Sequence, residues 1–361
     1  GKISIRQTTL LLILQIFNTS ILFLPRLAAE FAGRNGYILP VIAVLFGLFY
    51  MHCILNLTGR FPKDTLVEFT PKIVPAFIAY SIIFLFAVKL LISTGLELRL
   101  FSEMISSILL PETPLAVIML SMLLCIAYLV KSGVEAEARM AEIIMYFALV
   151  PLAIVFIAAA VKADYKQLMP FFQITAVEVG KGAFFVSLSF APLEFMLMMT
   201  GLMKKPEKAQ YAVTKALVIT ALLEMVIILL TYAGIGVEES KRQIWPVLTL
   251  MQTAKGSSST VGVQEILMMT GWIFSIFIYI SSGLYFASLI GSRSMRFKRE
   301  NVWVLPLLPV VYFIGSMPGS LAQTYKWYIN FQRYFGIWFL VPIPLILYLI
   351  AAARGLQNEK K

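Results

Sequence analysis

The stretch LLLILQIFNTSILFLP, residues 10–25, is an apolar run with the small polar patch NTS in its middle. A second apolar run, GAFFVSLSFAPLEFMLMM at residues 182–199, is interrupted in a corresponding place by SLSFAP. Non-helical backbone is tolerated at membrane depth only where it is buried in protein or lines a cavity. A matched pair of interrupted segments indicates a site built from broken helices. The two stretches therefore predict a binding site for a small polar molecule inside the bilayer.

The composition places the chain in the membrane. Of its 361 residues, 60% are hydrophobic and only 14% are charged, against about 25% charged in soluble domains. The mean hydropathy is +0.86. The net charge of +11 does not indicate nucleic-acid binding, because the basic residues lie in short connections between apolar runs. Two cysteines within apolar runs and a single histidine predict neither a disulfide nor a zinc site.

A membrane-spanning helix needs about 20 apolar residues. By this criterion we predict an all-α integral membrane protein with ten transmembrane helices, forming a single domain over residues 1–361. The expected spans are residues 7–29, 37–58, 74–109, 115–130, 140–161, 177–203, 211–235, 264–290, 302–316 and 338–353. The two interrupted segments are then the first and sixth spans.

Basic residues in the connections predict the orientation. One side of the expected topology carries 18 lysines and arginines, and the other side carries 8. Because the more basic side faces the cytoplasm, both termini are expected there. The long outer connection, residues 236–263, contains the run KGSSS and is either a lid or partner contact, or an ordinary surface loop.

The polar patches are candidate ligand contacts. Asn18, Thr19 and Ser20 favour turns over helix interiors, and a half-helix beginning near Ser20 would present free N–H groups to a carboxylate. In the sixth span, Pro192 removes a backbone donor, and Glu194 is placed to bind a substrate amine or to cap the second half-helix. The alternative is that both segments are kinked but continuous helices.

Ionisable residues within spans are functional candidates by default. The expected spans hold Lys89, Glu97, Arg99, Lys181 and Glu224. Lys89 has no acidic neighbour one turn away, and Glu224 of the seventh span is one possible partner for it.

Two of these charges have local partners. Arg99 and Glu103 are spaced i,i+4 and Glu178 and Lys181 are spaced i,i+3, so each pair is expected to form a structural ion pair.

Hydroxyls of the eighth span are a further candidate. Ser281 and Tyr285 share a helix face, where they suit a ligand or an ion, although small residues packed between helices explain Ser281 and Ser282 equally well. The sequence has no phosphate-binding loop, no metal-binding histidine pair and no serine nucleophile with a base, so we expect no enzyme, no cofactor and no metal centre.

Several motifs carry a family resemblance. They are ISIRQ at 3–7 before ILFLP at 21–25, GRFP at 59–62 before TLVE at 65–68, PETP at 111–114, and GVE at 133–135 before Arg139. In this order and spacing, the chain resembles the spore-germination permease family, the B subunits of nutrient germinant receptors, within the amino acid–polyamine–organocation superfamily. The resemblance implies a five-plus-five inverted repeat, here residues 7–161 and 177–353, with discontinuous first and sixth helices.

The resemblance also implies a function. Such subunits lie in the spore inner membrane, sense small nutrients such as amino acids, and act with an A subunit and a lipoprotein C subunit. The ligand is expected between the first and sixth helices, flanked by the third and eighth. The positions that match are Asn18, Thr19, Ser20, Ser93, Ser187, Ser189, Ala191, Ser281 and Tyr285.

Two departures from the family pattern bear on mechanism. Relatives usually have glycine where Asn18 and Thr19 stand, and the fifth span has no lysine of the kind that replaces sodium in some proton-coupled transporters. Two other functions remain open from the sequence. One is a proton- or sodium-coupled amino acid transporter, and the other is an ion or water conduit lined by Lys89 and Glu224.

Overall fold

The computed structural model describes residues 1–20, 23–169, 174–253 and 263–356. Over these residues the secondary structure is helical, apart from one isolated β-bridge between Ile3 and Met203. Seven helical segments are long and apolar enough to cross a membrane, and two shorter apolar helices accompany them. The chain is therefore an all-helical membrane protein, whereas the ten-span count and the inverted repeat stay predictions.

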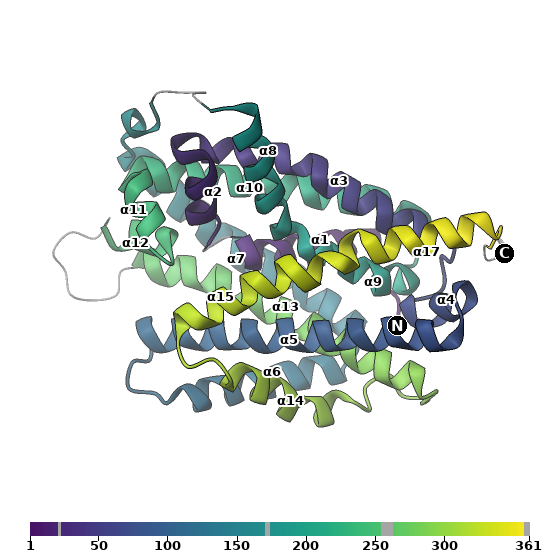
Figure 1. Ribbon diagram of the computed structural model, residues 1–361. Helices are drawn as coiled ribbons and strands as arrows, with labels where there is room; N and C mark the ends of the chain where they lie inside the picture. Colours follow the sequence, from purple (N-terminus) through teal and green to yellow (C-terminus); the bar gives the residue numbers. More distant parts are fainter. Residues whose placement is uncertain (21–22, 170–173, 254–262, 357–361) are drawn as a thin grey trace.

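The helices lie roughly along one axis, with both chain termini at the same end of the bundle, here called the terminal end (Figure 1). In chain order they are α1 (Ile5–Ser20), α2 (Leu24–Ala32), α3 (Leu39–Thr58), α4 (Leu66–Ile73), α5 (Ala76–Ile108), α6 (Leu115–Lys131), α7 (Val134–Lys162), α8 (Ala176–Ser187), α9 (Met196–Leu202), α10 (Ala209–Ile235), α11 (Val237–Arg242), α12 (Pro246–Thr253), α13 (Val263–Ser294), α14 (Val304–Ser316), α15 (Leu321–Phe331), α16 (Ile337–Leu340) and α17 (Pro342–Ala353).

The first predicted interruption is a break between two helices. α1 ends at Ser20 and α2 begins at Leu24, with Pro25 in its first turn. Proline suits the first turn of a helix because its missing N–H would have no partner there. Pro25 therefore starts the second helix instead of bending the first. Residues 21 and 22 of the interruption lie outside the described part of the chain.

The second interruption is a tightened helix and not an opened one. Between α8 and α9 the chain forms the 3₁₀-helix η3 (Leu188–Phe195), which contains Pro192. A 3₁₀ stretch keeps the chain helical while changing the direction of its side chains, and it often marks a functional position. The alternative of a bent but continuous helix therefore describes this segment better than two free half-helices.

Two predicted boundaries are wrong. The fifth expected span begins six residues earlier, at Val134, because Gly133 at φ +87° allows the sharp turn that starts α7. The tenth begins at Leu321, not at residue 338, and continues through the π-helix η5 (Gln332–Gly336). In both places polar residues within the helix made the segment resemble a connection.

Small residues set the packing around α5. Gly95 of α5 faces Gly315 of α14 so closely that a Cβ on Gly315 would lie 2.8 Å from the Gly95 carbonyl oxygen. On another side of α5, a Cβ on Gly283 of α13 would meet the Thr94 hydroxyl. Small residues let membrane helices approach each other closely, where dispersion contacts replace the hydrophobic effect. α5 is thereby held between α13 on one side and α14 on the other.

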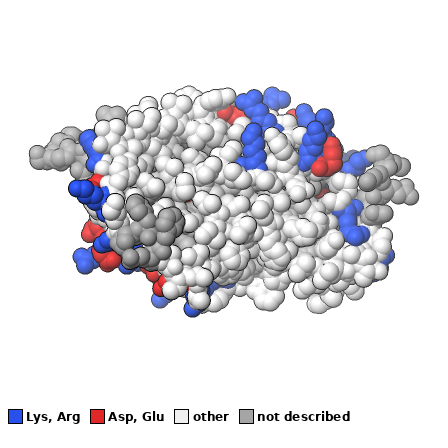
Figure 2. Space-filling model, turned by 90° about the horizontal axis from the view of Figure 1, so that it is seen from above, with Lys and Arg blue, Asp and Glu red and all other residues white. Residues whose placement is uncertain are grey.

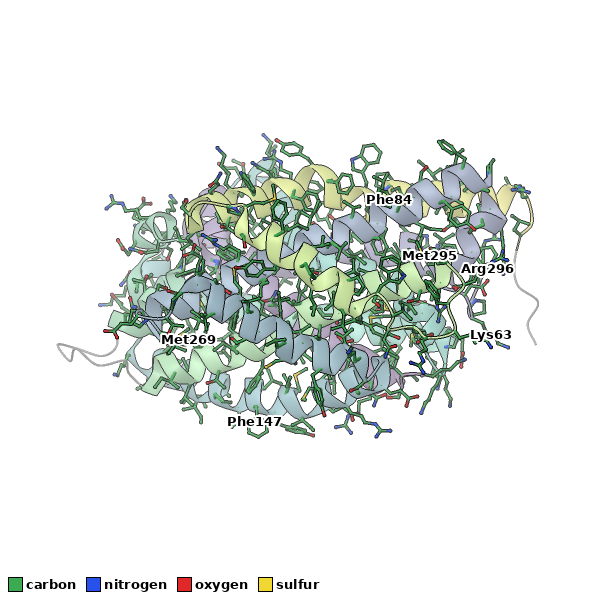
Figure 3. All side chains as sticks on the ribbon, turned by 90° about the horizontal axis from the view of Figure 1, so that it is seen from below. Lys63, Phe84, Phe147, Met269, Met295 and Arg296 are labelled. Atoms are coloured by element: carbon green, nitrogen blue, oxygen red, sulfur yellow. The ribbon has the colours of Figure 1, made fainter. Side chains whose placement is uncertain are left out.

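The surface fits a lipid environment. Charged side chains gather toward the two ends of the molecule, and a broad uncharged band separates them (Figure 2). Phe84 of α5 and Phe147 of α7, between the two ends of the bundle, have 66% and 59% of their surface exposed (Figure 3). Lys63 and Arg296 lie together at the terminal end (Figure 3). Exposed aromatic rings on the sides and cations at one end are the distribution expected of a membrane-spanning bundle.

The contact between α5 and α14 is testable. We expect Gly315→Leu to destabilise the protein by about 1–3 kcal/mol, because the larger side chain overpacks a site with no free space. The measurement is the free energy of unfolding in mixed micelles. Gly180→Ala is the matched control, since a Cβ on Gly180 meets nothing within 4 Å. Equal stability of the Gly315→Leu protein and the wild type would contradict this packing.

Candidate ligand site

One face of α5 carries a buried polar stripe. Lys89, Ser93 and Glu97 are spaced four residues apart and have exposed fractions of 0%, 2% and 3%. A spacing of four places side chains one above another on a helix. Three polar groups are therefore held in a line inside an apolar bundle, where each requires a partner.

Lys89 forms a buried ion pair with Glu194 of η3. The predicted partner, Glu224, is instead buried in α10 and does not pair with Lys89. The sequence predicts that Glu194 binds a substrate amine or caps a half-helix. In the structure, its carboxylate binds the side-chain amine of Lys89. Bringing two charges out of water costs several kcal/mol per ion, which only close pairing offsets. The ion pair therefore fastens the 3₁₀ segment to α5.

Further along the stripe, two tyrosines and a glutamine join the cluster. Gln332 of η5 donates its side-chain N–H to the Ser93 hydroxyl at 3.2 Å. The hydroxyls of Tyr279 and Tyr328 contact each other, and Tyr328 also contacts the Glu97 carboxylate. This polar cluster joins α5, α13, α15 and η5, far apart in the sequence.

Asn18, near the end of α1, faces the carboxylate of Glu97. It is 1% exposed, and its contact with Glu97 places the end of α1 against the stripe of α5. The side chains of Thr19 and Ser20 lie outside the described residues. Of the predicted patch, Asn18 is therefore the residue that the structure assigns to the cluster.

A cavity of about 320 Å³ leads toward this cluster from the end opposite the termini. Its walls come from α2, α8 with the start of η3, and α15 with η5. Arg26 and Glu30 form an ion pair at its partly exposed rim, with N–O 3.1 Å. Ser189, Tyr328 and Gln332 form its buried inner wall. The volume lies within the range of small-molecule sites.

Several buried polar atoms of the cavity wall and of the residues that contact the polar stripe of α5 have no hydrogen-bond partner among the described residues. They are Oε2 of Glu194, both amide atoms of Asn18, and Oε1 of Gln332. Buried polar atoms are nearly always satisfied, so a group of exceptions in one place calls for water or a ligand. Their mixture of acceptors and a donor suits a polar molecule with both functions.

The other predicted contacts have different roles. Ser187 shares a hydrogen bond with Tyr50 of α3, at 2.6 Å between the hydroxyl oxygens, and Ala191 is buried in η3. Ser281 and Tyr285 do share a face, but Ser281 donates to Glu137 of α7 and Tyr285 donates to Glu300. Neither Ser281 nor Tyr285 lines the cavity.

The two predicted local ion pairs have opposite outcomes. Arg99 and Glu103 do pair, at 2.8 Å between Nη2 and Oε1. Glu178 instead closes the capping box of α8, accepting the backbone N–H of Thr175 at 3.0 Å and its hydroxyl at 2.8 Å. Lys181 is exposed. The Glu178 carboxylate therefore caps the N-terminus of α8 by binding Thr175, and it does not pair with Lys181.

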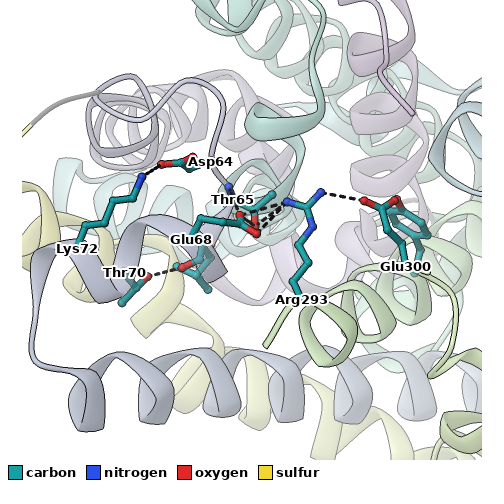
Figure 4. Close-up of polar contacts among 9 residues, drawn as sticks. Asp64, Thr65, Glu68, Thr70, Lys72, Arg293 and Glu300 are labelled. Carbon is teal, nitrogen blue, oxygen red and sulfur yellow. Dashed lines mark hydrogen bonds and ion pairs between the residues drawn. The ribbon is translucent and has the colours of Figure 1, made fainter. Parts of the chain in front are cut away.

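A charged network closes the terminal end (Figure 4). Arg293, in the last turn of α13, donates to both oxygens of Glu68 at 3.1 and 3.2 Å and to Glu300 at 3.0 Å. Glu68 also completes the capping box of α4, whose N-cap residue is Thr65, by accepting the Thr65 backbone N–H at 2.8 Å. One guanidinium thus ties α4, α13 and the segment before α14 together. The cavity and the Arg293 network therefore lie at opposite ends of the bundle.

Tyr279, Tyr328, Gln332 and Glu137 were not predicted from the sequence. Tyr328 and Gln332 lie one turn apart, as do the polar residues of α5, so a search for i,i+4 polar pairs would have found them. The misplaced starts of the fifth and tenth spans left Glu137, Tyr328 and Gln332 in expected connections, which hid them.

Together, the apolar helical bundle, the paired helix irregularities and the cavity beside a buried polar cluster define a membrane protein with a polar interior. Comparison with known proteins gives its family. The model of the spore germination protein family matches residues 2–324, and the chain belongs to that family. The predicted family resemblance is confirmed.

Curated relatives cover nearly the whole chain. Spore germination protein YndE of Bacillus subtilis is 25% identical over 319 residues, which is 88% of each chain. Spore germination protein A2 of the same organism is 23% identical, covering 94% of this chain and 92% of its own length. Spore germination protein KB is 21% identical over 100% of this chain and 97% of its own length.

The buried ion pair yields a stability prediction. Lys89→Met is expected to lower the free energy of unfolding in mixed micelles by about 3–5 kcal/mol, because it leaves Glu194 buried without its counter-charge. The double variant Lys89→Met/Glu194→Met should recover most of this loss. Arg99→Met is the control: its local pair is only partly buried, with 12% and 23% of the two side chains exposed, and the substitution should cost about 1 kcal/mol. Strictly additive effects of the two single substitutions would refute the pairing.

The terminal network yields a second prediction. Arg293→Gln should speed amide hydrogen exchange in α4 about tenfold, because hydrogen bonds to charged groups contribute roughly 1.5–3 kcal/mol. Arg296→Gln, at an exposed neighbouring position, should leave α4 unchanged. Similar exchange rates in the two variants would show that Arg293 does not hold α4.

Proposed function

We propose that this chain is the membrane subunit of a nutrient germinant receptor and that it binds a small zwitterion, such as an amino acid, beside the Lys89–Glu194 ion pair. The observation that carries the proposal is the position of Lys89 near Gln332 of the cavity wall, since a Cβ on Gly336 would meet both Gln332 Oε1 and Cε of Lys89. The ion pair also leaves one Glu194 oxygen without a hydrogen bond among the described residues. Membership of the spore germination protein family supports the physiological role.

The chemistry of the pair selects the ligand. A ligand with a single charge would leave either Lys89 or Glu194 uncompensated after displacing its partner, at a cost of several kcal/mol. A zwitterion avoids this cost, because its ammonium replaces Lys89 at Glu194 while its carboxylate binds Lys89. Asn18 and Gln332, whose buried amide atoms have free hydrogen-bonding capacity, are placed to orient the bound molecule. Ser189 completes the polar inner wall.

Signalling follows from where the contacts lie. The proposed ligand bridges α5, η3 and the end of α1. α1 packs on η3, and α5 is joined to them by the Lys89–Glu194 ion pair and by the contact of Glu97 with Asn18. A ligand shifts a conformational equilibrium only by its differential affinity for the two states. Separating Lys89 from Glu194 loosens η3 from α5, so the zwitterion favours an arrangement of the bundle that the ion pair opposes. The receptor's A and C subunits would respond to this arrangement.

The proposed setting is the spore inner membrane. The chain would cross it ten times, as two five-helix repeats, with both termini in the cytoplasm. The cavity then opens away from the cytoplasm, where an external nutrient arrives, and the Arg293 network holds the cytoplasmic end closed. No catalytic step is needed in this role.

The experiment is a binding measurement with the purified chain in lipid nanodiscs. Free amino acids, their methyl esters and their N-acetyl derivatives are compared by thermal shift. At a concentration 100 times its Kd, a ligand stabilises the native state by about 2.7 kcal/mol. We expect stabilisation by at least one free amino acid and by neither of its derivatives, which lack one charge of the zwitterion.

Lys89→Met should abolish this stabilisation. Lys181→Met, which removes an exposed lysine near the same end of the molecule, should retain it. If the ester stabilises the protein as well as the amino acid does, or if Lys89→Met binds normally, the proposal is wrong. Accumulation of labelled amino acid in proteoliposomes under an ion gradient would identify a transporter instead of a receptor.

A further inference from the structure

A groove on the outside of the bundle lies between α6 and α7. It has a volume of about 740 Å³, and its lining includes Leu124, Cys125, Tyr128, Arg139, Ile143 and, from α13, Phe277. Leu124, Tyr128 and Ile143 are 68%, 82% and 55% exposed. None of these residues lines the cavity described above. An open apolar groove on the side of a membrane bundle faces lipid, so its natural occupant is an amphiphile of the bilayer.

The groove runs inward from the terminal end. α6 ends at Lys131 and α7 begins at Val134, and this connection lies at the terminal end (Figure 1). The N-terminus holds it there, because the Lys2 backbone N–H donates to Glu135 at 2.8 Å. At 1.5 Å per residue, Arg139 lies about 8 Å along α7 and Ile143 about 14 Å. The groove therefore has a charged outer end and an apolar depth, which is the polarity of a phospholipid.

Arg139 has no counter-charge within the described part of the chain. Its side chain is exposed, and none of the salt bridges formed by the described residues involves it. Glu135, one turn earlier, is engaged by the backbone of the N-terminus, and Glu142, one turn later, lies 3.9 Å from Arg6. Lys131, in the last turn of α6, adds a second exposed cation at the same connection. The outer end of the groove is therefore positively charged.

We propose that this groove binds an anionic phospholipid, with the phosphate at Arg139 and an acyl chain along Leu124 and Ile143. A guanidinium binds phosphate through two parallel hydrogen bonds, which makes arginine well suited to this contact. A phospholipid with a choline headgroup brings its own cation to the positively charged end of the groove, which weakens its attraction. A basic residue at a membrane surface favours an anionic lipid about fivefold.

The bound lipid acts on the start of α7. Glu137 lies two residues before Arg139, which places the two side chains on nearly opposite sides of the helix. Glu137 accepts hydrogen bonds from Ser281, at 3.0 Å, and from Ser282, both on α13. The phosphate and α13 would thus hold the same two turns from opposite sides. An anionic lipid therefore stabilises the packing of α7 against α13.

The native cysteines supply the test. Cys125 lines the groove and is exposed, whereas Cys53 is buried. The purified chain in detergent micelles is titrated with phosphatidylglycerol or phosphatidylcholine of the same acyl chains, and the rate at which N-ethylmaleimide modifies Cys125 is measured by mass spectrometry. We expect phosphatidylglycerol to protect the thiol at a mole fraction about fivefold lower than phosphatidylcholine requires. No amino acid is present, so the result is independent of the proposed nutrient site.

Variants separate the groove from a general effect of lipid charge. Arg139→Gln should reduce the ratio of the two half-protecting mole fractions to about twofold or less, because the phosphate loses its partner. Arg139→Lys, which keeps the charge, should retain the preference. So should Arg296→Gln, which removes an exposed cation of the terminal end outside the groove.

Four results would overturn the proposal. They are equal protection of the wild type by both lipids, and a full preference in Arg139→Gln, which would reflect the surface charge of the micelle. The third is protection by glycerol phosphate, which has no acyl chain and would assign Arg139 to a free phosphate. The fourth is protection that needs no added lipid and disappears on dilution of the protein, which would assign the groove to a second copy of the chain.

Discussion

In a bundle surrounded by lipid, water is not available to solvate a lysine and a glutamate that face each other at the centre of the fold. Lys89 and Glu194 form an ion pair in which each compensates the buried charge of the other. Because the pair must stay together, η3 cannot drift from α5, and the neighbouring residues of both elements are held in register. The polar stripe, the inner wall of the cavity and the end of α1 are all positioned around this contact. A single desolvated interaction thus sets the geometry of the whole polar interior.

Irregular helices supply the rest of that interior. A regular α-helix satisfies its own backbone and offers only side chains to a neighbour. The break before α2, the 3₁₀ turns of η3 and the π-turn of η5 each change the direction of the side chains that follow. All three irregularities lie beside the same cavity or cluster. The apolar outer surface, by contrast, comes from long regular helices such as α5 and α7.

Patterns within one segment were easier to predict than pairings between segments. Hydropathy located the apolar helices, and the i,i+4 spacing of Arg99 and Glu103 was enough to predict their ion pair. The partner of Lys89 could not be chosen that way, because Glu194 and Glu224 both lie far from it in the sequence and only the three-dimensional structure shows which of them approaches α5. Polar residues within the helices caused the boundary errors, since Glu137 and Gln332 are residue types common in loops but are buried here. Family motifs, which depend on order along the chain, were sufficient to identify the family.

The π-helix η5 also changes how this point of the chain responds to a deletion. A π-turn holds one more residue than an α-turn. Removing one residue between Gln332 and Gly336 would let the turn close as a regular α-turn, so that later side chains such as Phe339 and Leu347, now buried, would keep their orientation. In a regular helix such as α5, the same deletion would rotate every later side chain by about 100° around the helix axis. The C-terminal helix is therefore less sensitive to the loss of a residue at η5 than a regular helix of this bundle would be.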